Sequence, residues 1–496
     1  MEKNKCKGCM NCGNIELDPD KPNFFRFRKV GDQVLITNDF GGSHFLSEAD
    51  FKDFAEGKIT PIHEQYDPLM KAGFLKSDID VDMALNLYRS RNASIFYGPS
   101  LHIIVVTLRC NYKCVYCQAS SRPMDGIGYD MDIETARKTV DFIFSTPNPS
   151  ITIEFQGGEP LINWEAIKFI TEYARQKEAE TGKKVFLSLV SNLSLLDEEK
   201  LDFIIDHGVG LCTSIDGPEE LHNLNRPMPG GNSYRETMDR VDRIKKLEAD
   251  REAEKKPMYK LSALLTVSKR SLSQPKEIID EYLKHGFTGI HLRPLSYLGD
   301  ATKTGDSIGY SALEFMDFWK RSLDYILELN MAGAEFTERG SAIVLQKILK
   351  AMDPGYVDLK SPCGAVIGQM LYNYDGKIYT CDEGRMCEGD VFALGRVDDT
   401  GGEETKEAYN ENYKRIVTGG KTKAMLVAST LDNTPCDYCA YKPYCGVCPV
   451  INYSTSGNLY PQMATSDWCV RQKAMFDYLF EKMQHPEYLK IFKKWI

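Results

Sequence analysis

Three closely spaced cysteines are the residues best suited to chemistry: Cys110, Cys114 and Cys117, in RCNYKCVYCQAS. In a reducing compartment, clustered thiolates favour zinc or iron–sulfur clusters, because sulfur is a soft ligand. Three thiolates can hold three irons of a [4Fe–4S] cube and leave the fourth iron open. A zinc ion would still lack a fourth ligand, and zinc sites normally use paired CxxC segments. The segment therefore predicts a cluster with one open iron.

Polar motifs follow at the ends of later apolar runs. In FQGGEP, Gly157 and Gly158 let the backbone approach a ligand, and the Glu159 carboxylate can bind an ammonium group. A plain turn is the alternative for this motif. Further candidates, for which helix caps are the alternative, are Ser191, Asn192, Ser214, Asp216 and Arg293.

The other cysteines fall mainly into two groups. The total of 15 is odd, and a secreted disulfide scaffold would be shorter, with its cysteines spread along the chain. Cys6, Cys9 and Cys12 match the start of a ferredoxin run that lacks its Cys-Pro, so a further cluster, zinc with a distant ligand and an unligated tail all stay open. Cys212 is predicted to be a buried apolar residue inside a strand. Eight stand in the C-terminal third: Cys363, Cys381, Cys387, Cys436, Cys439, Cys445, Cys448 and Cys469.

Alternating strands and helices position the first set of motifs. Amphipathic stretches of helical length, such as 133–144 and 234–247, separate the apolar runs. Regular alternation predicts an α/β fold with a parallel sheet, and six units suit an open, partial (β/α)6 barrel. Every polar motif above falls at the carboxyl end of a predicted strand, where such barrels place their active sites. The six predicted strands are 101–107, 151–155, 184–190, 208–215, 260–267 and 287–294.

The regions on either side of the barrel have different patterns. A hairpin at 24–37, a short strand at 43–47 and two helical stretches ending near Gly73 predict a winged-helix-like module. Between Cys363 and Cys469 the apolar periodicity weakens, so bound metal is expected to stabilise the fold of this region. The predicted domains are a tail at 1–20, the module at 21–95, the barrel at 96–300, a helical bridge at 301–360, a cysteine-rich domain at 361–470 and a final helix at 471–496.

Composition limits the function classes. Hydrophobic residues make up 42% and charged residues 27% of the 496, which is typical of a globular chain. A net charge of −10 argues against nucleic-acid binding. No apolar run is long enough for a membrane span, and no secretory signal is recognised, so a cytoplasmic protein is expected.

The CxxxCxxC segment, with Tyr116 before the third cysteine, resembles the signature of radical S-adenosylmethionine (SAM) enzymes. The resemblance implies that the open iron chelates SAM and that the cluster reductively cleaves it to methionine and a 5′-deoxyadenosyl radical. The Gly157–Glu159 motif resembles the one that holds the methionyl amine, and the later polar residues resemble contacts to ribose and carboxylate. No general acid or base is assigned; Asp216 is the nearest candidate, although a ribose contact is favoured for it.

The C-terminal cysteines resemble the SPASM extension, a twin-cluster domain of peptide-modifying radical SAM enzymes. The last spacing, Cys445-x2-Cys448, has two intervening residues, whereas three are commoner in this extension. The resemblance implies three [4Fe–4S] clusters in all, one binding SAM and two auxiliary. One auxiliary cluster would take Cys436, Cys439, Cys445 and Cys469. The other would take Cys363, Cys381 and Cys448, with Cys387 or an open iron as its fourth position.

The N-terminal module resembles the precursor-recognition domain of enzymes that modify ribosomally made peptides, with a small packing domain as the alternative. Residues 20 to about 470 resemble the radical SAM maturase of His-Xaa-Ser peptide systems. This implies a small precursor peptide bound through its leader at the edge of the third strand near 44–46, and an external one-electron donor of the flavodoxin or ferredoxin type. The alternatives are a formylglycine-generating sulfatase maturase and a non-catalytic iron–sulfur or zinc scaffold.

Overall fold

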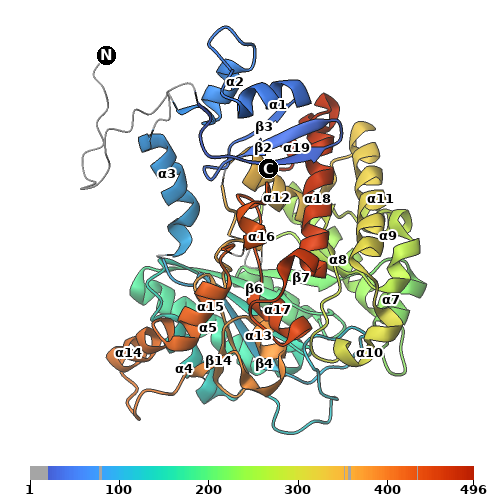
Figure 1. The fold of residues 1–496 in the computed structure, drawn as a ribbon. Coiled ribbons are helices and arrows are strands. Elements are labelled where there is room, and N and C mark those ends of the chain that lie inside the picture. The colour runs from blue at the N-terminus through green and yellow to red at the C-terminus, as the bar shows by residue number, and fades with distance from the viewer. Residues whose placement is uncertain (1–20, 77–80, 96, 351, 356–358, 433) are drawn as a thin grey trace.

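A computed structural model describes residues 21–76, 81–95, 97–350, 352–355, 359–432 and 434–496 (Figure 1). Cys6, Cys9 and Cys12 lie outside the described residues. The expected α/β fold is confirmed: barrel strands β4 to β8 and β10 run parallel and neighbour one another in chain order. Their bounds are β4 Leu101–Thr107, β5 Ser150–Gly157, β6 Lys184–Val190, β7 Val209–Ser214, β8 Ser262–Thr266 and β10 Leu292–Arg293.

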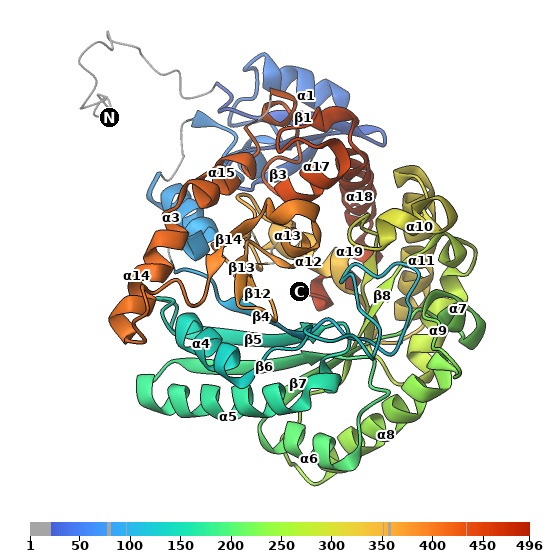
Figure 2. The same ribbon diagram turned by 90° about the horizontal axis from the view of Figure 1, so that it is seen from below.

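Amphipathic helices cover the outside of these strands (Figure 2). The helix expected at 133–144 is α4, which Asp132 caps by accepting a hydrogen bond from the Thr135 N–H. Its buried residues, including Val140 and Ile143, pack into the main core. The helices around the barrel are α4 Ile133–Ile143, α5 Trp164–Thr181, α6 Glu198–Asp206, α7 Glu219–Asn225, α8 Ser233–Ala253 and α9 Pro275–Lys284.

The prediction of one continuous strand at 287–294 is wrong. This segment forms β9 (Gly289–Ile290) and β10, which belong to different sheets. β9 pairs in parallel with β11 (Thr337–Glu338), and the Leu292 N–H bonds the Glu338 carboxylate at 3.2 Å. The backbone therefore changes partners at His291, because Glu338 brings a second short strand beside it.

The barrel sheet continues into the C-terminal third, which the sequence did not predict. β12 (Gln369–Tyr372) pairs in parallel with β4, and β13 (Lys377–Tyr379) and β14 (Ala393–Arg396) extend the sheet in antiparallel fashion. The residues we call the auxiliary domain (361–470) are thus built onto the first barrel strand. The helices here and before it are α10 Ala301–Ile308, α11 Ala312–Met331, α12 Arg339–Leu349, α13 Asp382–Met386, α14 Lys406–Val417, α15 Gly420–Ala428, α16 Thr434–Asp437 and α17 Pro449–Ser456.

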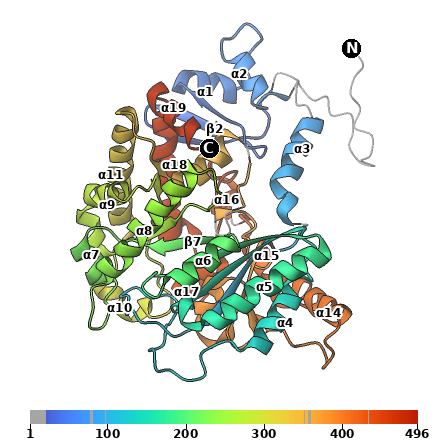
Figure 3. The ribbon, with the colours of Figure 1, turned by 180° about the vertical axis from the view of Figure 1, so that it is seen from behind.

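The N-terminal module (residues 21–76) has the expected element order. Its antiparallel sheet β1-β2-β3 precedes helices α1 and α2, and Ser47 caps α1 through the Asp50 N–H. Figures 1 and 3 show this sheet against the last long helix, α18. The elements are β1 Arg26–Val30, β2 Gln33–Thr37, β3 Ser43–Leu46, α1 Glu48–Ala55, α2 Tyr66–Lys71 and α3 Val81–Asn92, with α18 Asp467–Met483 and α19 Pro486–Lys494 at the other end.

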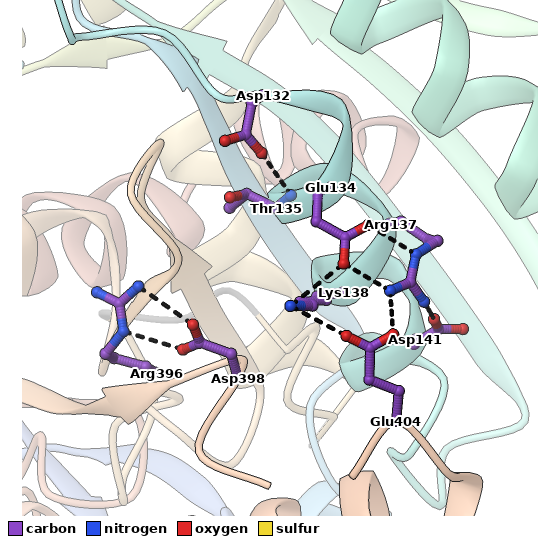
Figure 4. A network of polar contacts seen from close by, with 9 residues as sticks. All are labelled: Asp132, Glu134, Thr135, Arg137, Lys138, Asp141, Arg396, Asp398 and Glu404. Carbon is purple, nitrogen blue, oxygen red and sulfur yellow. Dashed lines mark hydrogen bonds and ion pairs between the residues drawn. The ribbon is translucent and has the colours of Figure 1, made fainter. Parts of the chain in front are cut away.

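Exposed charges join α4 to the auxiliary domain (Figure 4). Glu404, just before α14, pairs with both Arg137 and Lys138, and Glu134 pairs with the same two cations. Each such pair is weakly stabilising in water. Among the described residues, no helix has the length and apolarity that a bilayer crossing requires.

Candidate active site and auxiliary metal centres

The three-cysteine loop begins shortly after β4 and is fixed by backbone hydrogen bonds from a nearby segment and from two segments far away in the sequence. The Cys110 N–H donates to Arg122 O at 2.8 Å, and the Val115 N–H donates to Asn225 O at 2.9 Å. On the other side, Cys117 O accepts from the Asp300 N–H at 2.9 Å. Burial raises the pKa of the Cys114 thiol to about 12. These hydrogen bonds therefore fix the backbone of a loop that carries three partly buried thiols. Three thiols are the donor set that a cluster with one open iron needs.

Gly157 and Gly158 bring the end of β5 against this loop. A Cβ on Gly157 would lie 2.4 Å from Thr107 O, and one on Gly158 would lie 2.3 Å from Arg109 O. The Glu159 N–H then donates to Arg109 O at 2.7 Å. The close approach that the glycines allow is thus to the protein's own backbone, and it places Glu159 beside the cysteines.

The Glu159 carboxylate is buried and links the ends of β5 and β6. Oε1 accepts from Ser191 Oγ at 2.7 Å, and Oε2 accepts from the Asn192 N–H at 2.8 Å. The Asn192 side chain donates to Asn111 in the cysteine loop at 2.9 Å. Burial raises the pKa of Glu159 to about 7, although these hydrogen bonds oppose the rise. Three predicted site residues therefore form one network with the loop.

Asp216 lies at the end of β7 in a fully buried group. Its oxygens accept from the Tyr116 hydroxyl at 2.5 Å and from Arg226 Nε at 3.3 Å. Burial raises the pKa of Asp216, and the Arg226 charge opposes that rise. Asp216 has no exposed surface and both its oxygens have protein partners, so it holds Tyr116 in place. Ser214, also at this strand end, is half-buried.

Sequence reasoning missed Arg226. Its guanidinium lies 5.4 Å from the centre of the Tyr116 ring and pairs with Asp216. It stands within HNLNRP, at the end of α7, with no strand end or motif to mark it. Only the fold brings it to the cysteine loop.

A cavity of about 470 Å³ opens between β10 and the auxiliary domain. Arg293, the predicted site residue of β10, lines it, but none of the three loop cysteines does. Its walls carry aromatic side chains, including Tyr310 and Trp319 from the helical segment after the barrel and Trp468 from the auxiliary domain. Glu383, two residues after Cys381, also lines it. The cavity thus lies between the barrel and the auxiliary domain and has the size of a ligand site.

Four predicted auxiliary ligands surround one small cavity of about 40 Å³: Cys436, Cys439, Cys445 and Cys469. They come from α16, the loop after it and the first turn of α18. Burial, together with the nearby thiols of Cys439, Cys436 and Cys469, raises the pKa of Cys445 to about 12. Four thiols around one small cavity are the donor set of a [4Fe–4S] cluster, whereas a single tetrahedral ion would need the sulfur atoms closer together than they lie here.

The other predicted set also comes together. Cys363, Cys381 and Cys448 are buried in one apolar cluster, and Cys387 packs at its side. Burial raises the pKa of Cys387 to about 12, and the nearby Cys448 contributes to the rise. The Cys381 thiol also lies within 4.8 Å of the carboxylates of its neighbours Asp382 and Glu383. Soft sulfur is the better ligand for iron–sulfur chemistry, which favours Cys387 over these oxygens.

Cys212 is half-buried within β7. Burial raises the pKa of its thiol to about 11. It belongs to neither cysteine group of the auxiliary domain.

Comparison with known proteins finds a family match within the barrel. Residues 104–251 match the family model of the Radical SAM superfamily. The cysteine-type anaerobic sulfatase-maturating enzyme of Clostridium perfringens is 25% identical over 398 residues, or 78% of this chain and 98% of that enzyme.

Solved structures share the fold across most of the chain. Native anSMEcpe with bound AdoMet and Kp18Cys peptide has a TM-score of 0.63 at 21% identity and covers 80% of this chain and 100% of its own. Streptococcus suis SuiB bound to precursor peptide SuiA has a TM-score of 0.50 at 12% identity and covers 88% of this chain and 96% of its own.

Proposed function

We propose that this radical SAM enzyme installs a crosslink or a similar modification in a small, ribosomally made precursor peptide, of the His-Xaa-Ser type. The superfamily implies SAM and one [4Fe–4S] cluster. The observation that carries the peptide proposal is the open edge of β3. In the part of the chain that the structure describes, β3 pairs only with β2.

The hydrogen-bond pattern defines what this edge offers. The Asn38 N–H donates to Gly42 O, so residues 38 and 42 form a hydrogen-bonded pair. Hydrogen-bonded and non-bonded pairs alternate in an antiparallel ladder, and Thr37 pairs with Ser43 in the next register. Ser43 and Phe45 therefore point their N–H and C=O groups away from β2. An extended leader peptide would add a strand here through main-chain hydrogen bonds.

The cavity beside β10 would receive the part of the peptide that is modified. Its volume and aromatic walls suit an extended peptide segment, and Arg293 stands where the barrel meets it. The solved structures with Kp18Cys and SuiA peptides support a peptide as the bound substrate. An external electron donor of the flavodoxin or ferredoxin type completes the proposal.

In this proposal, the chain's own residues bind and orient the cluster and SAM. Cys110, Cys114 and Cys117 would hold the first cluster, and Glu159, placed beside them by the glycines, would take the methionyl ammonium of SAM. When bound, cluster and SAM supply a carbon-centred radical that abstracts hydrogen from the substrate. The aromatic walls of the cavity beside β10 would help to exclude water from the substrate.

Two auxiliary clusters complete the proposed cofactor set. Cys436, Cys439, Cys445 and Cys469 would hold one. The other would take Cys363, Cys381, Cys387 and Cys448. The anaerobically reconstituted chain is then expected to hold about 12 irons, or about 16 if Cys6, Cys9 and Cys12 bind a further cluster.

A matched pair of variants tests leader binding. Ser43→Pro removes an outward N–H at the first residue of β3, where proline is tolerated in a strand, and Ser43→Ala keeps it. Under this proposal, the peptide is expected to be the product of a short neighbouring reading frame with His-Xaa-Ser repeats. Mass spectrometry of that peptide after reaction is expected to show a modification with wild type and Ser43→Ala and a strong loss with Ser43→Pro. Equal modification by both variants would remove β3 as the leader site.

Formylglycine formation is the second candidate. It is favoured by the match to 98% of the sulfatase-maturating enzyme of Clostridium perfringens. Such a substrate has no leader, so a short sulfatase-derived peptide with a central Cys or Ser distinguishes the two functions. Conversion of that peptide to the aldehyde, with no change in the His-Xaa-Ser peptide, would replace the first proposal.

A further inference from the structure

The sheet of the N-terminal module has two different faces. Cross-strand partners share a face, so Arg26 opposite Thr37 and Leu35 opposite Phe45 lie on one side. The alternate residues Val34, Ile36 and Leu46 lie on the other side, in the module's own core with Phe54 of α1. The first face is also buried, although no helix of the module covers it.

The cysteine loop of the auxiliary domain covers this first face. Thr37 Oγ1 donates to Ala440 O at 2.6 Å, and Arg26 Nε donates to Asp437 O at 2.6 Å. In the opposite direction, the Tyr444 hydroxyl donates to Gly41 O at 3.0 Å. Asp437, Ala440 and Tyr444 each directly adjoin one of Cys436, Cys439 and Cys445 in the sequence. The side chains of Thr37 and Tyr444 are almost completely buried.

The helix with the fourth cysteine is held from the same face. Arg28 donates two hydrogen bonds to Asp477, at 2.6 and 2.7 Å, and the Tyr441 hydroxyl donates to the same carboxylate. Phe45 meets Phe480 edge-on, with ring centres 6.1 Å apart. Asp477 and Phe480 lie on α18, whose first turn carries Cys469. One sheet face therefore contacts every segment that brings a cysteine to the cavity of about 40 Å³.

We infer that the N-terminal module is a structural part of the metal site formed by Cys436, Cys439, Cys445 and Cys469, with Thr37, Arg26 and Arg28 as positioning residues. This rests on the proposed metal site and is independent of the peptide. Backbone hydrogen bonds inside this ten-residue loop, such as those from Cys439 N–H to Cys436 O and from Cys445 N–H to Tyr441 O, shape it locally but do not attach it to the rest of the protein. Hydrogen bonds from β1 and β2 fix two of its carbonyls, which sets the direction of the thiols beside them.

Thr37 offers the sharpest test, because its hydroxyl reaches the loop between two ligands. Thr37→Val keeps the shape of the side chain and removes the hydroxyl donor, which leaves the buried carbonyl of Ala440 without this hydrogen bond. Thr37→Ser keeps the donor. Ser47→Ala is the matched control. It removes the cap of α1 and loosens the same module from its other face, away from the loop.

The readouts are the rate of iron loss to a chelator and the electron paramagnetic resonance spectrum of the reconstituted full chain. Thr37→Val is expected to lose about four of about 12 irons roughly tenfold faster than wild type, with one auxiliary signal altered. Thr37→Ser and Ser47→Ala are expected to stay within about twofold of wild type.

Wild-type iron loss and spectrum in Thr37→Val would overturn the inference, as would equal acceleration by Ser47→Ala. The four-cysteine variant, with Ala at 436, 439, 445 and 469, separates failure of the proposed metal site from failure of the inference about the N-terminal module. If it retains all iron, the metal site itself is wrong and the inference falls with it. If it loses about four irons while Thr37→Val behaves as wild type, the inference alone is wrong.

Discussion

The two cysteine sites of this protein are built in different ways. The loop with Cys110, Cys114 and Cys117 takes all its ligands from one turn after β4, and successive strand ends of the same barrel fix it. The site with Cys436 and Cys469 takes its ligands from segments about thirty residues apart, and a sheet at the other end of the chain supports those segments through hydrogen bonds. The first site is therefore held mainly by its own domain, with single side-chain hydrogen bonds from Thr304 and Arg385, whereas the second depends on how three parts of the chain dock.

The largest expected effect concerns the first site. Changing Cys110, Cys114 and Cys117 together to Ala is expected to remove about four of about 12 irons and to abolish 5′-deoxyadenosine formation. The auxiliary spectra are expected to persist, because those thiols lie in another domain. Iron analysis and chromatography of the SAM products check this, and SAM cleavage at the wild-type rate would rule out the assigned loop.

The second site is expected to fail in a different way. Cys469→Ala opens one position of the four-thiol set on α18 and is expected to destabilise that cluster. Uncoupled SAM cleavage is expected to stay within about threefold of wild type, while peptide modification is lost. Comparison of the two rates checks the separation, and a parallel fall of both would mean that the two sites do not act independently.

The buried group beside the first site is expected to be the strongest stability determinant of the barrel. Asp216→Ala leaves the Arg226 charge buried without its partner and is expected to cost about 3–5 kcal/mol in unfolding free energy. Tyr116→Phe removes one hydrogen bond and is expected to cost about 1 kcal/mol. Urea unfolding of the apoprotein measures both, and equal costs would show that the ion pair contributes little.

Glu159 gives the first site a pH dependence. Its pKa is raised to about 7, so the carboxylate gains its proton as pH falls below 7. Only the charged form can bind the SAM ammonium, so SAM affinity is expected to fall up to tenfold per pH unit below 7 and to be flat above. Calorimetry between pH 6 and 8 measures this. Glu159→Gln is expected to bind weakly at every pH; an unchanged profile in that variant would remove Glu159 from SAM binding.

The exposed charges between α4 and the auxiliary domain give the smallest expected effect. Glu404→Gln breaks contacts with Arg137 and Lys138 on the surface and is expected to cost less than about 1 kcal/mol. Arg28→Gln, at the half-buried bidentate contact with Asp477, is expected to cost more. Thermal unfolding of both variants compares the two costs. A larger cost for Glu404→Gln than for Arg28→Gln would mean that surface charges contribute more to the packing of the domains than the half-buried contact does.

The sequence by itself determined the barrel and the cysteines of its first loop. Regular alternation predicted the parallel strands, and the motifs fell at their ends because parallel strands share one carboxyl edge. It also identified the four thiols that meet at α18, through a resemblance and not through any local pattern. These features are periodic or closely spaced, so they can be recognised without knowledge of distant contacts.

Only the tertiary structure decided what depends on distant pairs. Arg226 reaches Tyr116 and Asp216 through the packing of α7, and β12 joins β4 across more than 260 residues. The division of 287–294 between two sheets was fixed by Glu338, which no local pattern indicates. The docking of Thr37 onto Ala440 joins two segments 403 residues apart. Such contacts form because buried polar groups need partners, and the partner can come from anywhere in the chain.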